Sequence, residues 1–183
     1  YGLTDTEIIL NEWNYIRGWT DEYVYSIECI GNHKGAAFVM ACLSEGQREP
    51  IDLMMYYDTR PSCFCGPFDY YTYRPRKPYY PLYWYGMFYD LAAEVRAQNQ
   101  VDEIYTLCGV DEAGRATAVV TYYTDDDGAP DRTIRLDFGQ QAEYSLYRLD
   151  ERHDGELCGL TDDLTLTLPR QSCVLIRQTG DRR

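Results

Sequence analysis

The sequence predicts a chain in two parts, an α/β segment followed by an all-β domain. Over residues 1–95, short apolar runs alternate with segments whose apolar residues recur at helical spacing. From about Val101, short strand-like runs follow one another at regular spacing, separated by turn-forming residues. The first pattern is typical of parallel strands with crossover helices, and the second is typical of an antiparallel sandwich.

The first part of the chain reads as strand, helix, strand and helix. Ile8–Leu10 predicts a short buried strand, and helical spacing follows over Asp21–Leu43. Ile51–Tyr57 predicts a second buried strand, after which a proline-rich, aromatic loop occupies residues 59–81. A second helix is expected over residues 82–95. This order is the βαβα signature of a parallel sheet.

The second part contains only short strands and turns. Clusters such as Asp125–Gly128 and His153–Gly155 are typical of turns. Six strands are expected around such clusters: Ile104–Val110, Thr117–Tyr123, Thr133–Phe138, Tyr144–Leu149, Leu164–Leu168 and Ser172–Arg177. The polar stretch Arg96–Gln100 is short and is no flexible Ser/Gly linker, so we expect two tightly packed domains, residues 1–95 and 96–183.

Composition and charge exclude several classes of function. The net charge of -13 and the pI near 4.5 argue against a nucleic-acid partner, whose phosphates require a basic surface. No apolar run approaches the roughly 18 residues that span a bilayer, so no membrane segment is expected. A neutral substrate fits this charge better than an anionic one.

Cysteine usage indicates reduced thiols. The seven cysteines are an odd number and are scattered through apolar segments. Cys63 and Cys65 form a C-x-C pair, but this spacing is a poor zinc signal without a second pair or clustered histidines. We therefore expect no metal, no cofactor and a cytoplasmic location.

The most informative feature is a carboxylate at the end of the first predicted strand. Glu12 comes after the apolar run, with Asn11 before it and Trp13 and Asn14 after it. Barrels of the α/β class carry catalytic groups at the C-terminal ends of their strands. A tryptophan face can stack on a sugar ring, while a carboxylate stabilises an oxocarbenium-like transition state. The pattern predicts a sugar site, although a Trp13 that points into the core fits the sequence equally well.

A second group of candidate residues follows the second predicted strand. Asp58 ends that strand, so its side chain could reach the same edge of the sheet as the first carboxylate. It could act as a second carboxylate in inverting chemistry, but hydrogen bonding to sugar hydroxyls or capping of the loop is the preferred interpretation. Tyr57 and Arg60 are substrate-binding candidates from their positions, as are Trp13 and Asn14.

Aromatic residues are concentrated in one region. Ten of the 19 tyrosines lie between Tyr56 and Tyr89. Aromatic clefts bind sugars by stacking, yet the helical spacing within residues 79–89 favours packing against a core or a domain contact. For the loop over residues 57–73, binding and packing are both open.

The strand-end residues resemble the nucleophile motif of clan A retaining glycoside hydrolases. The run Leu10–Asn14 is similar to the motif of family 39 xylosidase-like enzymes and, second, of family 51 arabinofuranosidase-like enzymes. Later landmarks also resemble family 39: Lys34–Ala37 in a helix, Tyr56–Asp58 at a strand end, Phe68–Tyr71 in an aromatic loop and Lys77–Tyr80 before the last barrel helix. The resemblance implies strands seven and eight of a partial (β/α)8 TIM barrel, followed by an antiparallel β-sandwich.

By this resemblance, Glu12 is the nucleophile of a retaining glycosidase and forms a glycosyl-enzyme that water later opens. The resemblance also implies an oligosaccharide or glycoside substrate, and an acid/base glutamate on a fourth barrel strand that this sequence does not contain. Asn11–Glu12 is itself an asparagine-glutamate pair, so an acid/base role for Glu12 is the alternative. The short distance from Glu12 to the sandwich, with one further strand between them, favours the nucleophile.

Two βα units cannot close an eight-stranded barrel, and they leave a parallel edge exposed. We therefore expect a missing barrel segment in the same or another chain, or self-association, and no turnover by this chain alone. Two non-enzymatic alternatives are a glycan-binding module that uses the tyrosine-rich loop and the sandwich, and a purely structural or interaction domain.

Overall fold

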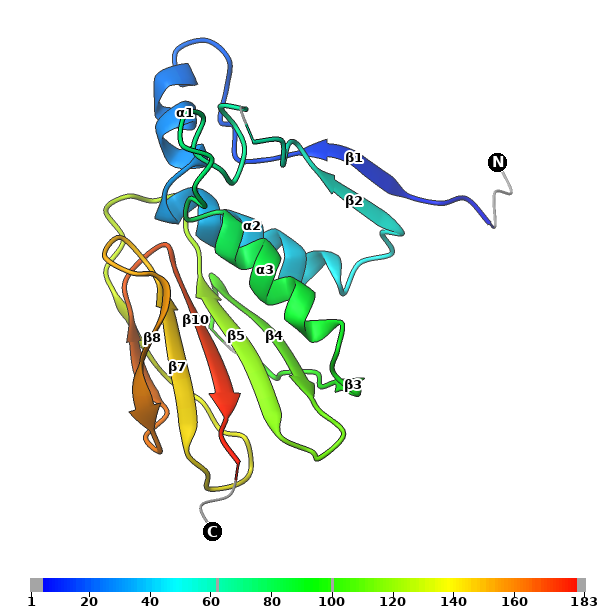
Figure 1. Cartoon of the computed structure of the whole chain (residues 1–183), viewed down its shortest axis with the longest axis vertical. Coiled ribbons are helices and arrows are strands. Elements are labelled where there is room, and N and C mark those ends of the chain that lie inside the picture. The colour runs from blue at the N-terminus through cyan, green and yellow to red at the C-terminus, as the bar shows by residue number, and fades with distance from the viewer. Residues whose placement is uncertain (1–4, 62, 100, 181–183) are drawn as a thin grey trace.

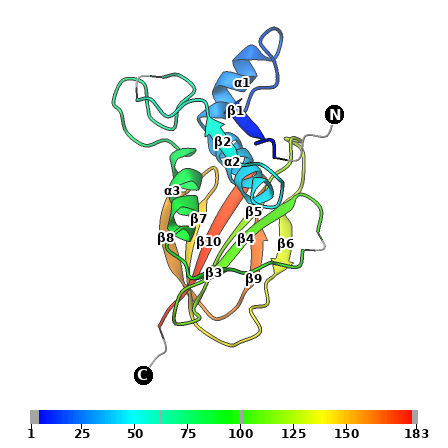
Figure 2. The same ribbon diagram turned by 90° about the vertical axis from the view of Figure 1, so that its right-hand side faces the viewer.

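The computed structural model describes residues 5–61, 63–99 and 101–180. Eight strands make up its all-β part: β3 Ala93–Glu94, β4 Ile104–Val110, β5 Ala116–Tyr122, β6 Arg132–Arg135, β7 Tyr144–Leu149, β8 Asp154–Thr161, β9 Thr165–Leu168 and β10 Ser172–Gln178. Six of them form an antiparallel sheet with the order β3-β4-β5-β10-β7-β8. The other two, β6 and β9, pair with each other and lie against one face of this sheet (Figure 2).

The helices lie on the opposite face of the six-stranded sheet. α2 (His33–Gly46) and α3 (Tyr79–Phe88) cover that face, and α1 (Tyr23–Ile30) precedes α2 (Figure 1). β1 (Ile9–Trp13) and β2 (Leu53–Tyr56) form a separate pair that extends away from the sheet (Figure 1). No helix in the described part of the chain combines the length and the apolar character needed to cross a membrane.

The parallel pairing expected for the first part is confirmed. β1 and β2 run parallel, with Ile9 opposite Leu53. The first strand was expected to be buried over Ile8–Leu10, but it spans Ile9–Trp13, and the side chains of Ile9 and Leu10 are 48% and 39% exposed. Within the described residues each of these strands pairs with only one other strand, so one edge of each strand is unpaired. The second strand is likewise shorter and more exposed than predicted.

The helical spacing over Asp21–Leu43 corresponds to two helices instead of one interrupted helix. α1 ends at Ile30 and α2 begins at His33. Asn32 separates them and caps α2, because its Oδ1 accepts a hydrogen bond from Lys34 N at 2.8 Å.

The last helix of the first part also differs from its prediction. It is expected over residues 82–95 but spans Tyr79–Phe88. The residues that follow join the open edge of β4, where Ala92 N donates a hydrogen bond to Val110 O at 2.9 Å. Because this edge satisfies the backbone groups of the incoming chain, the chain becomes extended as β3 instead of helical.

All six expected strands are present, and Ile104–Val110 and Tyr144–Leu149 have the predicted bounds. β3 and β8 were not expected. The turn predicted over His153–Gly155 is wrong, because the chain turns earlier, where Asp150 N donates to His153 O at 3.2 Å. The polar, glycine-containing β8 has little strand propensity of its own, and its pairing with β7 stabilises it.

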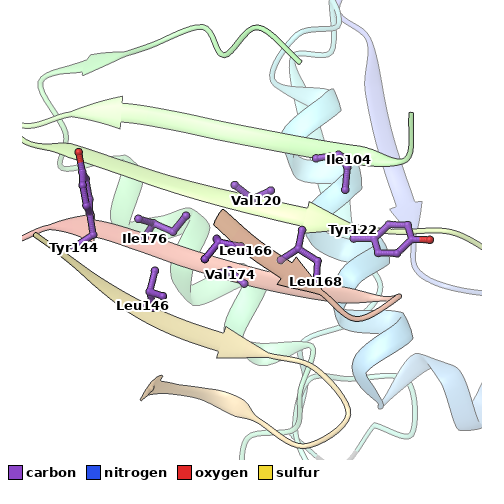
Figure 3. Close-up of a cluster of buried hydrophobic side chains, with 9 residues drawn as sticks. All are labelled: Ile104, Val120, Tyr122, Tyr144, Leu146, Leu166, Leu168, Val174 and Ile176. Carbon is purple, nitrogen blue, oxygen red and sulfur yellow. The ribbon is translucent and has the colours of Figure 1, made fainter. Parts of the chain in front are cut away.

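The central strands of the six-stranded sheet are buried on both faces. A first cluster lies toward β9 and is drawn in Figure 3: Ile104, Val120, Tyr122, Tyr144, Leu146, Leu166, Leu168, Val174 and Ile176. A second cluster lies toward the helices: Ala36, Ala37, Met40, Trp84, Val119, Leu149, Cys173 and Leu175. β5 shows the alternation, since Val120 belongs to the first cluster and Val119 to the second. The helices and the six-stranded sheet therefore share the second cluster, and Figure 2 shows α2 and α3 lying against the sheet.

Gly155→Ala is expected to lower the free energy of unfolding by about 2 kcal/mol. Gly155 has a φ of +81°, and an added Cβ would lie 2.5 Å from Tyr80 Cδ1, where β8 contacts α3. Gly114→Ala is the matched control, because Gly114 has a φ of +76° and its Cβ would have no atom within 4 Å. The control should lose only about 1 kcal/mol, the cost of the backbone conformation. Urea unfolding measures both values, and equal losses would mean that the Tyr80 contact contributes nothing.

Candidate active site at the ends of β1 and β2

The C-terminal ends of β1 and β2 are joined by two hydrogen bonds. Tyr57 N donates to Trp13 O at 2.9 Å, and Asn14 Nδ2 donates to Tyr57 O at 2.5 Å. Because the strands are parallel, these bonds bring the two groups of predicted site residues to one edge of the pair. Asn14 therefore holds the two strand ends together through its side-chain Nδ2.

Glu12 lies inside β1, one residue before the end of the strand, and not beyond that end as the sequence suggested. Its side chain is exposed. Among the described residues, no hydrogen bond or ion pair engages its carboxylate. Three hollows on the described chain are lined by other residues, and none of the three includes Glu12. The carboxylate therefore stands on an open strand end.

Trp13 packs between β2 and α2. Its ring lies 5.3 Å from the ring of Tyr56 at an interplanar angle of 84°, and 6.4 Å from the ring of Phe38. Its indole Nε1 is covered and has no hydrogen-bond partner in the part of the chain described here. These contacts favour packing over sugar stacking as the role of this side chain.

Asp58 faces its own loop. Its Oδ2 accepts hydrogen bonds from Arg60 Nε at 2.7 Å and Nη2 at 2.6 Å, and its Oδ1 accepts one from Arg60 N at 3.1 Å. Burial opposes the negative charge, but the hydrogen bonds from the Cys63 thiol and from Arg60 outweigh it and lower the pKa of Asp58. The Tyr57–Asp58 peptide bond is cis. Within the described residues no hydrogen bond joins Asp58 to Glu12, so its contacts favour loop capping over a paired-carboxylate role.

The aromatic region divides between packing and exposure. Trp84 is fully buried in the core, and the rings of Tyr79 and Tyr83 stack 5.8 Å apart. In the loop, Tyr70 and Tyr71 form an edge-to-face pair with ring centroids 5.1 Å apart, and Tyr71 is 85% exposed. The packing expected for residues 79–89 is thus present in part, while the loop offers exposed aromatic faces.

Sequence reasoning missed a buried lysine network next to this region. Lys34 is 1% exposed, and its Nζ lies 2.9 Å from both Asp125 Oδ1 and Asp127 Oδ1. It also donates a hydrogen bond to the Tyr25 hydroxyl at 2.6 Å. The Tyr15 hydroxyl donates to Asp125 Oδ1 at 2.7 Å. This network joins the start of α2 to the connection between β5 and β6.

The network changes the pKa values of its members. Burial is the largest influence on Lys34 and opposes its charge, but its hydrogen bonds with Tyr25, Asp127 and Asp125 outweigh burial and raise its pKa. Burial likewise opposes the charge of Asp127, but hydrogen bonds from Tyr25, Gln171 and Lys34 lower the pKa of this carboxyl. The positive charge of Lys34 and the negative charges of the two carboxylates thus stabilise each other. Such a network is suited to hold two parts of the fold together.

A second feature that sequence reasoning missed is the environment of the C-x-C pair. Cys63 and Cys65 are buried free thiols whose Sγ atoms lie 3.1 Å apart. Burial, and then the hydrogen bond with Cys63, raise the pKa of the Cys65 thiol to about 12. Only the fold places Asp58 beside them.

A comparison with models of known protein families finds no match, and no curated protein matches the sequence either. Solved structures do match. The chain overlays a glucosidase from Croceicoccus marinus with a TM-score of 0.69 and 14% identity, over 99% of this chain and 48% of that protein. It overlays a GH30 endoxylanase from Clostridium papyrosolvens C71 with a TM-score of 0.60 and 12% identity, over 95% of this chain and 42% of that protein.

A third similar structure is a family 44 xyloglucanase from Paenibacillus polymyxa, with a TM-score of 0.56 and 11% identity, over 95% of this chain and 32% of that protein. The chain thus spans less than half the length of each of these three proteins. The likeness shows that the chain has the fold of part of a glycoside hydrolase. The last two structures belong to families 30 and 44, not to families 39 or 51.

Proposed function

We propose that this chain is the C-terminal portion of a retaining glycoside hydrolase and that Glu12 is its nucleophile. In this proposal β1 and β2 are the seventh and eighth strands of a (β/α)8 barrel, and the all-β part is the accessory sandwich. The main support for this proposal is that 99% of the chain overlays 48% of a glucosidase with a TM-score of 0.69. A likeness that covers the helices, the parallel pair and the sandwich together supports a shared architecture from one end of the chain to the other.

The exposed faces of β1 and β2 support the same proposal. Ile8, Ile9, Leu10, Leu53 and Met55 are large apolar side chains that are 39–49% exposed. Such a patch is typical of a surface that another element covers. In a closed barrel, a sixth strand would pair with the free edge of β1 and a first strand with the free edge of β2. We propose a barrel segment of the same or another chain as the occupant.

The substrate proposed for the completed enzyme is a neutral oligosaccharide or glycoside of the xylose or arabinose type. The motif around Glu12 and the two xylan- and xyloglucan-degrading enzymes among the similar structures support this class. Retaining chemistry needs an acid/base carboxyl about 5–5.5 Å from the nucleophile. The completing segment would supply that carboxyl, because the contacts of Asp58 are already taken by Arg60 and Cys63.

The test is hydrolysis of aryl β-xylosides and aryl α-arabinofuranosides, with the configuration of the released sugar followed by NMR. The chain by itself should show no turnover. The same chain completed by a segment that carries the other six barrel strands should hydrolyse at least one substrate with retention. Release of the inverted sugar, or turnover by the isolated chain, would contradict the proposal.

The exposed Tyr70–Tyr71 pair favours one alternative function, a non-catalytic glycan-binding module. If this is correct, calorimetry on the 183-residue chain should detect binding of xylo- or arabino-oligosaccharides. Tyr71→Ala should weaken it by up to about tenfold, because one aromatic contact contributes roughly 0.5–1.5 kcal/mol. Tyr89→Ala is the matched control, since Tyr89 is exposed but lies after α3. Absence of heat with every oligosaccharide would exclude this alternative.

A further inference from the structure

Two buried thiols and a carboxylate come together in the loop that follows β2. The Sγ atoms of Cys63 and Cys65 lie 3.1 Å apart. A carboxylate oxygen of Asp58 lies within 4.8 Å of both sulfur atoms. Three donor atoms therefore converge from one short stretch of chain, two of them on the side chains of buried residues.

The loop is closed so that these donors keep their positions. Cys63 N donates to Arg60 O at 3.3 Å, and Gly66 N donates to Cys63 O at 3.3 Å. A Cβ on Gly66 would lie 2.9 Å from Asp58 O, so the two ends of the loop are in close contact. Both cysteines belong to a buried apolar cluster with Ile30 at the end of α1, and Ile16 packs against this cluster. Fixed donors with an apolar surround are what a metal site needs.

The charges that the three donor side chains and Arg60 would carry suit a divalent cation. Two thiolates and one carboxylate would carry three negative charges, which exceed the charge of the cation by one. The Arg60 guanidinium already contacts the Asp58 carboxylate at 2.6 Å and would balance that remaining charge. Because the Arg60 side chain is 73% exposed, it can also move aside as the cation approaches.

We propose that Asp58, Cys63 and Cys65 bind a thiophilic divalent cation such as Zn²⁺. Thiolate ligands select zinc over magnesium and calcium. Three protein ligands would leave the fourth tetrahedral position for water or another small ligand. With Zn–S bonds of about 2.3 Å, the sulfur atoms of a tetrahedral site lie about 3.8 Å apart, so the two thiols must separate by roughly 0.7 Å. The proposal does not depend on glycosidase activity.

The experiment is titration of the reduced 183-residue chain with Co²⁺, followed by displacement with Zn²⁺. We expect one cobalt ion per chain, a thiolate-to-cobalt charge-transfer absorption in the near ultraviolet, and loss of that absorption when zinc is added. Cys63→Ser and Cys65→Ser should each weaken zinc binding by more than about tenfold and reduce the absorption. Asp58→Asn leaves both thiols in place, so it should weaken binding by about tenfold while keeping the absorption of two thiolates.

Cys158→Ser is the matched control. Cys158 forms a second group with His153 and Glu156, whose ligand atoms also lie within 4.8 Å of one another. This group is more exposed, and the control should bind cobalt as the unsubstituted chain does. The proposal is overturned if the absorption disappears in Cys158→Ser, or if it persists unchanged in both Cys63→Ser and Cys65→Ser. It is also overturned if the reduced, folded chain gives no absorption when cobalt is added. A chain that is isolated with a Cys63–Cys65 disulfide is first reduced and then tested in the same way.

Discussion

Glu12→Gln in the completed enzyme is expected to lower kcat by roughly 10³–10⁶-fold and to leave substrate binding nearly unchanged. The amide cannot attack the anomeric carbon, yet it keeps the shape of the carboxylate. Steady-state kinetics on an aryl glycoside with a good leaving group, together with calorimetry on an unreactive oligosaccharide, measures both quantities. Glu7→Gln is the matched control, because Glu7 is an exposed glutamate just before β1 and should retain full turnover.

Azide distinguishes the nucleophile from the acid/base alternative. With Glu12→Ala, azide can enter the vacated space opposite the leaving group and form a glycosyl azide of inverted configuration. If Glu12 were the acid/base residue, azide would instead attack the glycosyl-enzyme and give the retained configuration. NMR of the azide product decides between the two roles. Unchanged turnover in Glu12→Gln would remove both of them.

Lys34→Met is expected to destabilise the chain by about 3 kcal/mol, equivalent to a Tm lower by roughly 6–12 °C. Methionine fills the space of the lysine stem but removes the ammonium group that contacts both Asp125 and Asp127. The loss of folding free energy should lie at the low end of the range for a broken buried ion pair, because both carboxylates are half exposed.

Lys77→Met is the matched control for this prediction. Lys77 Nζ lies 2.6 Å from Asp154 Oδ1, but Asp154 is 70% exposed, so the loss should stay below about 1 kcal/mol. Thermal and urea unfolding of both variants measures the difference. Equal losses in the two variants would contradict a special role for the buried network.

The network also predicts a pH dependence. The pKa values of Asp125 and Asp127 are lowered in the folded chain, so their stabilising contribution is present above the unfolded value of about 3.9. It is lost as the pH falls through the folded pKa values. The Tm difference between the unsubstituted chain and Lys34→Met should therefore be constant near neutral pH and should narrow in acid below about pH 4. A difference that widens in acid would contradict this assignment.

Local patterns predicted much of the fold. The apolar alternation of Ile104–Val110 and Tyr144–Leu149 predicted their bounds because packing on both faces of the sheet agrees with local propensity. β8 was missed because its pairing with β7, and not its own residues, makes it a strand. The helix expected over residues 82–95 ended early because the edge of β4 competes for the same backbone groups.

For the candidate site, the residue types near the end of each parallel strand can be read from the sequence, with Glu12 in the first group and Asp58 in the second. Adjacent residues in a strand-end motif are visible without a structure. Only the tertiary structure decided that Asn14 bonds to Tyr57, that Trp13 packs on Tyr56, and that the C-x-C thiols meet a carboxylate. Such contacts depend on strand pairing and loop closure, which bring together side chains whose spacing along the chain carries no signal.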